Sequence, residues 1–207
     1  MQALVDNDIL LKLCAFDLLD PALDRLSLAP ENVIVRDATY HSIRRSRQIA
    51  GRWGAATVNR AMVFLERVTR IQDPADQSEL DLLTAVERID PGEAELFVYA
   101  GEYAGAVLLT GDKNSLQALA AHEPARAIFA RLAGRVIILE TIVLALIRSM
   151  GFPAVRTSVC ANLQADNAMR SAFGSGPRAQ EVNVIHTLNG YVQDLESVVG
   201  KGWLRAL

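Results

Sequence analysis

Acidic side chains follow apolar, strand-like runs at two places in this chain, and an acidic pair opens a helical pattern at a third. Asp6 follows an Ala-Leu-Val run, Asp112 follows a longer run that ends in Thr-Gly, and Glu93 and Glu95 lie in the first turn of the helical pattern. In an open parallel sheet, ligands bind beyond the carboxyl ends of the strands. Because carboxylates at close range repel one another, their usual partner is a hard cation such as Mg²⁺ or Mn²⁺. The sequence therefore predicts a metal site with oxygen ligands.

The elements that must position these acids alternate along the chain. Short apolar runs, rich in β-branched residues or leucine, are typical of strands covered on both faces, and they span residues 3–5, 33–35, 106–109 and 135–139. Helical patterns span residues 9–19, 38–49, 56–70, 78–86, 92–103, 115–121 and 141–150. This alternation indicates βαβ units and an α/β fold with a parallel sheet.

The pattern changes near residue 152. Residues 153–176 show little periodicity, and we expect loops with one short helix there. A helical run then extends from Pro177, with apolar residues every three or four positions: Val182, Ile185, Leu188, Val192, Leu195 and Val199. This helix either packs on its own domain or forms a homodimer seam. We expect a domain over residues 1–152 and a helical C-terminal extension over residues 153–207.

Composition and charge bear on the cellular location of the protein and on its partners. The chain has 207 residues and a formal net charge of −3, so any contact with nucleic acid requires a local basic patch. Cys14 and Cys160 lie far apart without zinc-like spacing, which favours a reducing cytoplasm. The start of the chain does not resemble a signal peptide. The most apolar window, residues 136–147, is too short to span a bilayer and contains Glu140. We expect a cytoplasmic protein without a membrane segment.

The order of these motifs resembles that of the PIN domain family of metal-dependent ribonucleases. Leu-Val-Asp-Asn-Asp, which contains Asp6 and Asp8, is similar to the opening strand of that family. Leu-Thr-Gly-Asp-Lys, which contains Asp112, is similar to its later strand end. The Gly-Glu-Ala-Glu run from Gly92 matches one group within the family. The resemblance covers residues 1–152.

The resemblance implies a three-layer α/β/α sandwich with a central parallel sheet. It also implies that Asp6, Glu93 and Asp112 bind Mg²⁺ or Mn²⁺ and catalyse hydrolysis of an RNA phosphodiester through a metal-activated water. Glu95 is the competing ligand at the helix, and Asp8 either joins the metal site from the outer shell or caps the following helix. One role that the resemblance implies for such a nuclease is the toxin half of a toxin–antitoxin pair. Its partner would then be an antitoxin-like protein.

One position departs from the family pattern. The family has a further acid in the helix after the second strand, and Ser42 occupies that place here. Loss of this carboxylate implies weaker Mg²⁺ binding. The alternative function is therefore an inactive PIN-like domain that acts as a binding or assembly module, and a DNA-directed nuclease is a third option.

Basic residues gather beside the acidic stretch. Between Arg36 and Arg70 the arginines outnumber the acids, whereas acids dominate from Asp73 to Glu102. Arginines beside a metal pocket would guide a phosphate backbone, and the candidates for nucleic-acid binding are Arg44, Arg45, Arg47 and Arg52. The other interpretation is a solvated face whose arginines pair with the acidic stretch. We also expect Glu140 to pair with an arginine.

Overall fold

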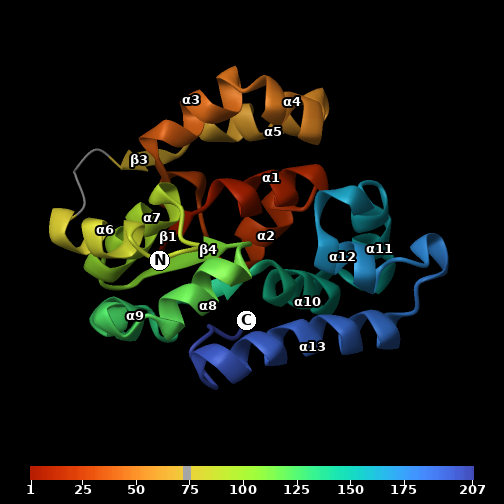
Figure 1. Ribbon diagram of the computed structural model, residues 1–207. Helices are drawn as coiled ribbons and strands as arrows, with labels where there is room; N and C mark the ends of the chain where they lie inside the picture. Colours follow the sequence, from red (N-terminus) through yellow and green to blue (C-terminus); the bar gives the residue numbers. More distant parts are fainter. Residues whose placement is uncertain (72–75) are drawn as a thin grey trace.

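Five short parallel strands form one sheet in the computed structural model, which describes residues 1–71 and 76–207 (Figure 1). The strands are β1 (Gln2–Val5), β2 (Val33–Arg36), β3 (Thr69–Ile71), β4 (Ala106–Thr110) and β5 (Val136–Ile138). Their order in the sheet is β3-β2-β1-β4-β5. Helices cover both faces of the sheet, which confirms the expected three-layer α/β/α fold with a central parallel sheet.

Side chains of each strand alternate between two hydrophobic cores, because successive strand residues point to opposite faces. In β1, Ala3 and Val5 join one core and Leu4 joins the other. In β4, Val107 and Leu108 divide in the same way. All these side chains are buried, as expected for strands that have helices on both sides.

The helices divide between the two faces. The core that contains Val5 receives residues from α1 (Asn7–Ala15), α2 (Leu19–Arg25), α3 (Asp37–Arg45), α4 (Arg47–Trp53), α5 (Ala55–Leu65), α10 (Leu139–Met150), α11 (Phe152–Cys160) and α12 (Asn167–Ala172). The core that contains Leu4 receives residues from α6 (Gln77–Thr84), α7 (Pro91–Glu102), α8 (Lys113–Ala121) and α9 (Arg126–Leu132). Helix α13 (Glu181–Val199) contributes to both cores. The 3₁₀ turns are η1 (Pro30–Asn32), η2 (Glu123–Ala125), η3 (Leu163–Ala165) and η4 (Gly176–Arg178).

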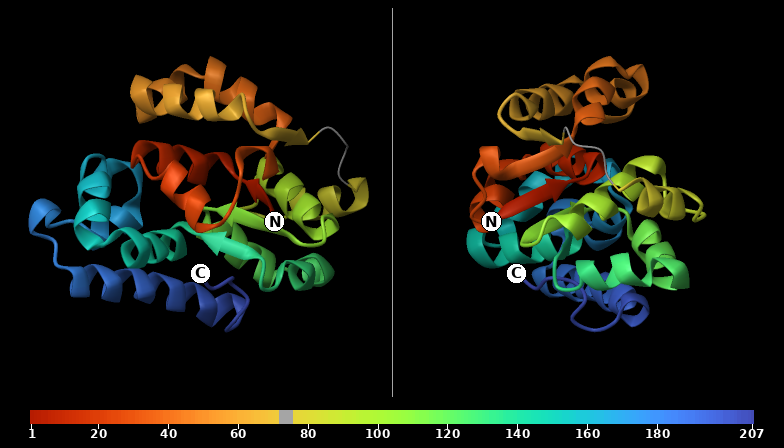
Figure 2. Two further views of the ribbon diagram at one scale, coloured as in Figure 1. Left: turned by 180° about the vertical axis from the view of Figure 1, so that it is seen from behind. Right: turned by 90° about the vertical axis from the view of Figure 1, so that its left-hand side faces the viewer.

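Helices α3, α4 and α5 form a layer above α1, and α13 runs along the opposite end of the molecule (Figures 1 and 2). Ser46 separates α3 from α4, where the sequence predicted one continuous helix over residues 38–49. The Ser46 side chain caps α4 by accepting a hydrogen bond of 3.2 Å from the Ile49 amide. A serine that binds a nearby backbone amide favours a helix start over a helix interior.

The edge strand β3 was missed by the sequence analysis. The expected helix over residues 56–70 ends at Leu65, and Thr69–Ile71 pairs with β2 instead. Only Ile71 of this strand is buried, so the segment lacks the apolar run that identified the other strands. Tertiary pairing, rather than local pattern, therefore decides its conformation.

The segment after residue 152 is more helical than predicted. The sequence predicted loops with one short helix over residues 153–176, but the structure has α11, η3 and α12 there, so that prediction was wrong. Phe152, Val155, Met169 and Phe173 are buried in the same core as Val5, and the Phe152 and Phe173 rings stack with centroids 6.2 Å apart. Burial against the sheet domain therefore orders this segment despite its weak periodicity.

Helix α13 buries a somewhat different face from the one expected. Leu188, Leu195 and Val199 are buried as predicted, but Val184 is buried in place of Val182. Val182 is 70% exposed. The helix packs on α8, α10 and α12, which corresponds to the intramolecular alternative of the sequence analysis.

Residues after α13 cover the outer edge of β5. Leu204 forms a parallel bridge with Val136, and the Arg205 amide donates a hydrogen bond of 2.8 Å to the Val136 carbonyl. The Trp203 ring stacks on Phe129 with centroids 4.7 Å apart. Among the described residues, no helix is long and apolar enough to cross a membrane.

We predict that Phe173→Ala destabilises the whole chain, because its side chain lies in the core shared with the sheet. The expected loss is about 3–5 kcal/mol in the free energy of unfolding, as for other buried Phe→Ala changes. Urea unfolding followed by tryptophan fluorescence and by circular dichroism measures it. Val182→Ala, at an exposed position, is the control and should change stability by less than about 0.5 kcal/mol. Two separate transitions, only one of which shifts in Phe173→Ala, would contradict a shared core.

Candidate metal and nucleic-acid site

The predicted site lies where the strand order reverses. The chain passes from β1 outward to β2 and β3, and then returns to the other side of β1 with β4. Val5 pairs with Leu109, and the Asp6 amide donates a hydrogen bond of 3.0 Å to the Leu109 carbonyl. Asp6 and Asp112 therefore follow two neighbouring strands at the crevice where open α/β sheets bind ligands.

Asp6 is buried and forms the N-cap of α1. Its carboxylate accepts a hydrogen bond of 2.7 Å from the Asn7 amide. Burial and the negative charge of Asp8 raise the pKa of Asp6 to about 6, although Arg36 and the backbone amides act in the opposite direction. Part of the Asp6 population is therefore protonated near neutral pH, unless a cation binds.

Asp112 forms the N-cap of α8. Its Oδ1 atom accepts hydrogen bonds of 2.7 Å from the Asn114 amide and 3.1 Å from the Ser115 amide. Within the part of the chain that the structure describes, Oδ2 of Asp112 accepts no hydrogen bond. One oxygen of this carboxylate is thus held by the helix, and the other is available to a ligand.

Glu93, the third predicted ligand, lies in the first turn of α7. Glu93 and Asp90 form a capping box, with hydrogen bonds of 2.9 Å and 2.8 Å between each side chain and the other residue's amide. Burial, followed by the charges of Asp112, Asp90 and Asp6, raises the pKa of Glu93 to about 8 against the opposite effect of the hydrogen bond from the Asp90 amide. Asp6 and Asp112 therefore lie close enough to Glu93 to act on it electrostatically.

Glu95, the competing ligand, has a different partner. Its Oε2 atom lies 3.3 Å from Nη1 of Arg36. The Arg36 guanidinium covers Gly92 so closely that a Cβ at this glycine would lie 2.3 Å from Nη1. Arg36 thus fills the space between the end of β2 and the start of α7, and it neutralises Glu95 rather than Glu93.

The site fits a divalent cation by charge, but its carboxylates do not converge in a coordination geometry. Among residues 1–71 and 76–207, no three Asp, Glu, His or Cys side chains are placed to hold one metal ion together. Each of Asp6, Glu93 and Asp112 is held by a helix-capping hydrogen bond. Coordination by all three would require side-chain rotation, which attraction to a bound cation would have to drive against the mutual repulsion of these acids.

Asp8 does not cap the helix, so that alternative was wrong; Asp6 is the N-cap. Asp8 pairs instead with Lys12, at 2.5 Å between Oδ2 and Nζ. The absence of a side chain at Gly111 makes room for this pair, because a Cβ there would lie 2.5 Å from Asp8 Oδ2 and 3.0 Å from Lys12 Nζ. Lys12 Nζ also lies 2.8 Å from Oδ2 of Asp166.

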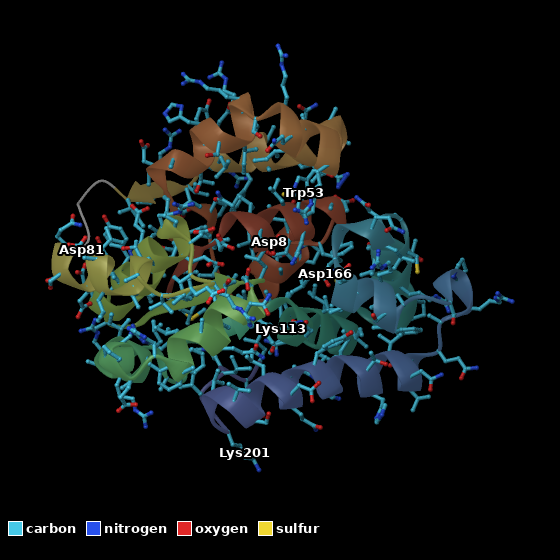
Figure 3. All side chains as sticks on the ribbon, viewed as in Figure 1. Asp8, Trp53, Asp81, Lys113, Asp166 and Lys201 are labelled. Atoms are coloured by element: carbon cyan, nitrogen blue, oxygen red, sulfur yellow. The ribbon has the colours of Figure 1, made fainter. Side chains whose placement is uncertain are left out.

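A polar cleft of ≈ 390 Å³ opens beside these residues. Its walls come from α1, α4, the start of α8 and the segment from η3 to the start of α12. Asp8, Trp53, Lys113 and Asp166 mark these four parts of the chain in Figure 3. The residues that line it are Asp8, Lys12, Arg52, Gly111, Asp112, Lys113, Asn114, Gln164, Ala165, Asp166, Asn167 and Ala168. The C-terminal segment therefore forms part of the cleft that contains Asp112.

The four arginines predicted to bind nucleic acid are exposed on α3 and α4. Within the described residues, none of Arg44, Arg45, Arg47 and Arg52 forms an ion pair. Arg52 lines the cleft, and its guanidinium lies 5.0 Å from the centroid of the Trp53 ring. Asp73 of the acidic stretch lies outside the described residues. These four positive charges are thus available to an external anion.

Two interactions of the site were not found from the sequence. Glu140 pairs with Lys113 rather than with an arginine, as had been expected. The Lys12 bridge between Asp8 and Asp166 was also missed. The spacing of Asp8 and Lys12, four residues apart on one helix, could have indicated half of this bridge. Asp166 could not be placed because its segment showed no clear pattern. Ser42, which the sequence analysis aligned with an acid of the PIN family, is exposed on α3.

Comparison with known proteins adds no assignment, since no family model, curated protein or solved structure matches the chain.

We predict that stability falls as pH rises from about 5 to about 8, because the folded pKa of Glu93 is about 8 and its ordinary value is 4.5. A carboxyl with a raised folded pKa binds its proton more tightly when folded, so deprotonation in this window costs the folded state free energy. Glu93→Gln should therefore be more stable than the wild type, with a gain that grows toward pH 8. Urea unfolding at several pH values measures this. Glu87→Gln, at an exposed position, is the control, and parallel curves for wild type and Glu93→Gln would contradict the raised pKa.

Proposed function

We propose that the protein is a metal-dependent ribonuclease of PIN type, with Asp6, Glu93 and Asp112 as its metal ligands. The single observation that carries this proposal is that Asp6 and Asp112 lie close enough to Glu93 for their charges to add to burial in raising its pKa, which is about 8. They stand at the strand-order reversal of a parallel sheet, beside a polar cleft. Acids gathered in this way are characteristic of hydrolases that use Mg²⁺ or Mn²⁺.

The chemistry would be hydrolysis of an RNA phosphodiester. When bound, a divalent ion supplies a water of lowered pKa and neutralises charge on the phosphate. Asp112 would present its unengaged Oδ2 atom to the ion, while Oδ1 stays fixed by the start of α8. Glu93 would lose its proton to solvent when the ion binds. Glu95 would remain with Arg36, and Asp8 with Lys12.

The exposed arginines of α3 and α4 would hold the RNA backbone. Arg52 links this surface to the cleft, because it lines the cleft and belongs to α4. Phosphate contacts of this kind position a nucleic acid without reading its sequence. An RNA strand bound by Arg44, Arg45 and Arg47 would pass Arg52 and then reach Asp112. The arginines would thereby lead the RNA toward the carboxylates.

The second candidate is an inactive PIN-like domain that serves as a binding or assembly module. Two observations favour it: no three ligand side chains are placed together among the described residues, and Arg36 lies close enough to Asp6 to lower its pKa. Ser42 at the family's acidic position has the same implication. In this case the arginines would bind RNA without hydrolysis.

The partners proposed are RNA and an antitoxin-like protein, in a cytoplasmic setting. A homodimer through α13 would have to use the exposed side of that helix, where Val182 and Val198 are 70% and 51% exposed, because its main apolar face packs on the same chain. An antitoxin-like protein would be expected to cover the cleft or the arginines of α3 and α4.

We predict that the intact chain binds Mn²⁺ and cleaves RNA in its presence, and that Asp6→Asn loses both properties. The reason is that Asp6 is buried near Asp8 and Arg36 and acts on Glu93 through its charge, which an amide cannot supply. Calorimetry measures the binding, and gel analysis of a labelled RNA measures the cleavage. Asp194→Asn, on the exposed surface of α13, is the matched control. Cleavage that persists in Asp6→Asn would assign the activity to another site, and Mn²⁺ binding without cleavage would favour the module.

We also predict that Arg45→Gln/Arg47→Gln weakens RNA binding and lowers its salt dependence. For single strands, each phosphate contact adds about 0.7 to the slope of log affinity against log salt, so loss of two contacts should reduce it by about 1.4. Fluorescence anisotropy at several salt concentrations gives this slope. Arg25→Gln/Arg178→Gln removes two exposed arginines elsewhere and should leave it unchanged. An equal effect of both double variants would show that net charge, and not this surface, determines binding.

A further inference from the structure

Lys12 is the least expected residue of the cleft, because a lysine is seldom buried unless it is paired. Its residue is 7% exposed, and its ammonium is bound by Asp8 at 2.5 Å and by Asp166 at 2.8 Å. Burial opposes the ammonium charge, but the two carboxylates outweigh burial and raise the pKa of Lys12. Lys12 is therefore a fixed positive charge at all pH values near neutrality.

The two carboxylates leave one donor of this ammonium unused. A lysine ammonium has three N–H donors and no acceptor. Within residues 1–71 and 76–207, Asp8 and Asp166 are the only side chains that form ion pairs with this ammonium. Lys12 also lines the cleft, beside Gly111 and Asp112. The remaining donor is thus available to an acceptor inside the cleft, within reach of the proposed reaction centre.

The acceptor that suits this donor is an anionic oxygen. A fixed ammonium next to metal-binding carboxylates can hold a phosphate oxygen that the carboxylates alone would repel. Asp8 and Asp166 fix the direction of the ammonium, because each is itself held. Asp166 caps α12 through a hydrogen bond of 2.9 Å from the Met169 amide, and Asp8 lies against Gly111.

We propose that Lys12 contacts a phosphate oxygen of the bound RNA, and that Asp166 of the C-terminal segment positions it for this contact. This inference rests on the proposed function for the identity of the ligand. It assigns residues 164–168 to the substrate-binding site, although they lie outside the part of the chain that resembles the PIN family. The C-terminal segment would then be required for substrate binding as well as for stability.

The test measures RNA binding without divalent ions, so that it does not depend on cleavage. A short fluorescein-labelled RNA is titrated by anisotropy in EDTA at several salt concentrations. Lys12→Gln should weaken binding about tenfold, as expected for one charge-assisted contact, and should lower the salt slope by about 0.7. Lys201→Gln, at an exposed lysine at the far end of α13, is the matched control and should change neither value (Figure 3).

A second variant separates this contact from folding. Lys12→Gln leaves two carboxylates facing each other, whereas Lys12→Gln/Asp166→Asn removes one of these charges. Asparagine caps helices as well as aspartate does, so α12 retains its start. Asp166→Asn alone keeps the ammonium but removes one of the two carboxylates that fix its direction, so it should weaken RNA binding while the salt slope stays the same. Unchanged affinity of folded Asp166→Asn would overturn the positioning role of Asp166. The double variant should show the same reduced slope as Lys12→Gln, and circular dichroism checks that each variant is folded.

The outcomes distinguish this inference from the proposed function. If the wild type binds and cleaves RNA but the salt slope is unchanged in folded Lys12→Gln or in the double variant, the role of Lys12 is overturned and the proposed nuclease function stands. If the wild type binds RNA but does not cleave it in Mn²⁺, and the salt slope is reduced in Lys12→Gln, the nuclease proposal is overturned and the Lys12 contact stands. Absence of RNA binding by the wild type would overturn both.

Discussion

The parallel pairing of β1 with β4 is the constraint on which the candidate site depends. It places the residues that follow Val5 and Leu109 side by side, so Asp6 and Asp112 become neighbours although they are far apart in the sequence. Each acid then starts a helix, which fixes one carboxylate oxygen to backbone amides. Helix α7 adds Glu93 to the same group. Sheet topology therefore creates the concentration of negative charge, and helix capping limits how far its members can move.

Opposite charges are distributed around this group rather than within it. Arg36 pairs with Glu95, Lys12 with Asp8 and Asp166, and Lys113 with Glu140. These cations neutralise the outer carboxylates and leave Asp6, Glu93 and Asp112 without a salt bridge among the described residues. Burial and the negative charges of neighbouring acids raise the pKa values of Asp6 and Glu93. Perturbed carboxylates gathered in this way mark a candidate functional site.

Much of the fold was predictable because the buried strands have a strong local pattern. The runs at β1, β2, β4 and β5 are continuous and apolar, and their alternation with helices determined the parallel sheet. Strand β3 was not predictable, since only Ile71 of it is buried and pairing with β2 defines it. Helices α11 and α12 were missed for a related reason, because their order depends on burial against the sheet domain and not on periodicity. The Lys12–Asp166 bridge required knowledge of that packing, so no pattern in the sequence could have indicated it.

The cover over β5 has a consequence for the sheet as a whole. Open strand edges expose unpaired amides and carbonyls to which strands of other molecules can add. At β5, Leu204 bridges Val136 and the Arg205 amide binds the Val136 carbonyl, while the Trp203 ring shields the adjoining surface by stacking on Phe129. At the opposite margin, β3 has only three residues. Intermolecular sheet growth is thereby hindered on both sides, so resistance to aggregation is built into the same topology that assembles the acidic crevice.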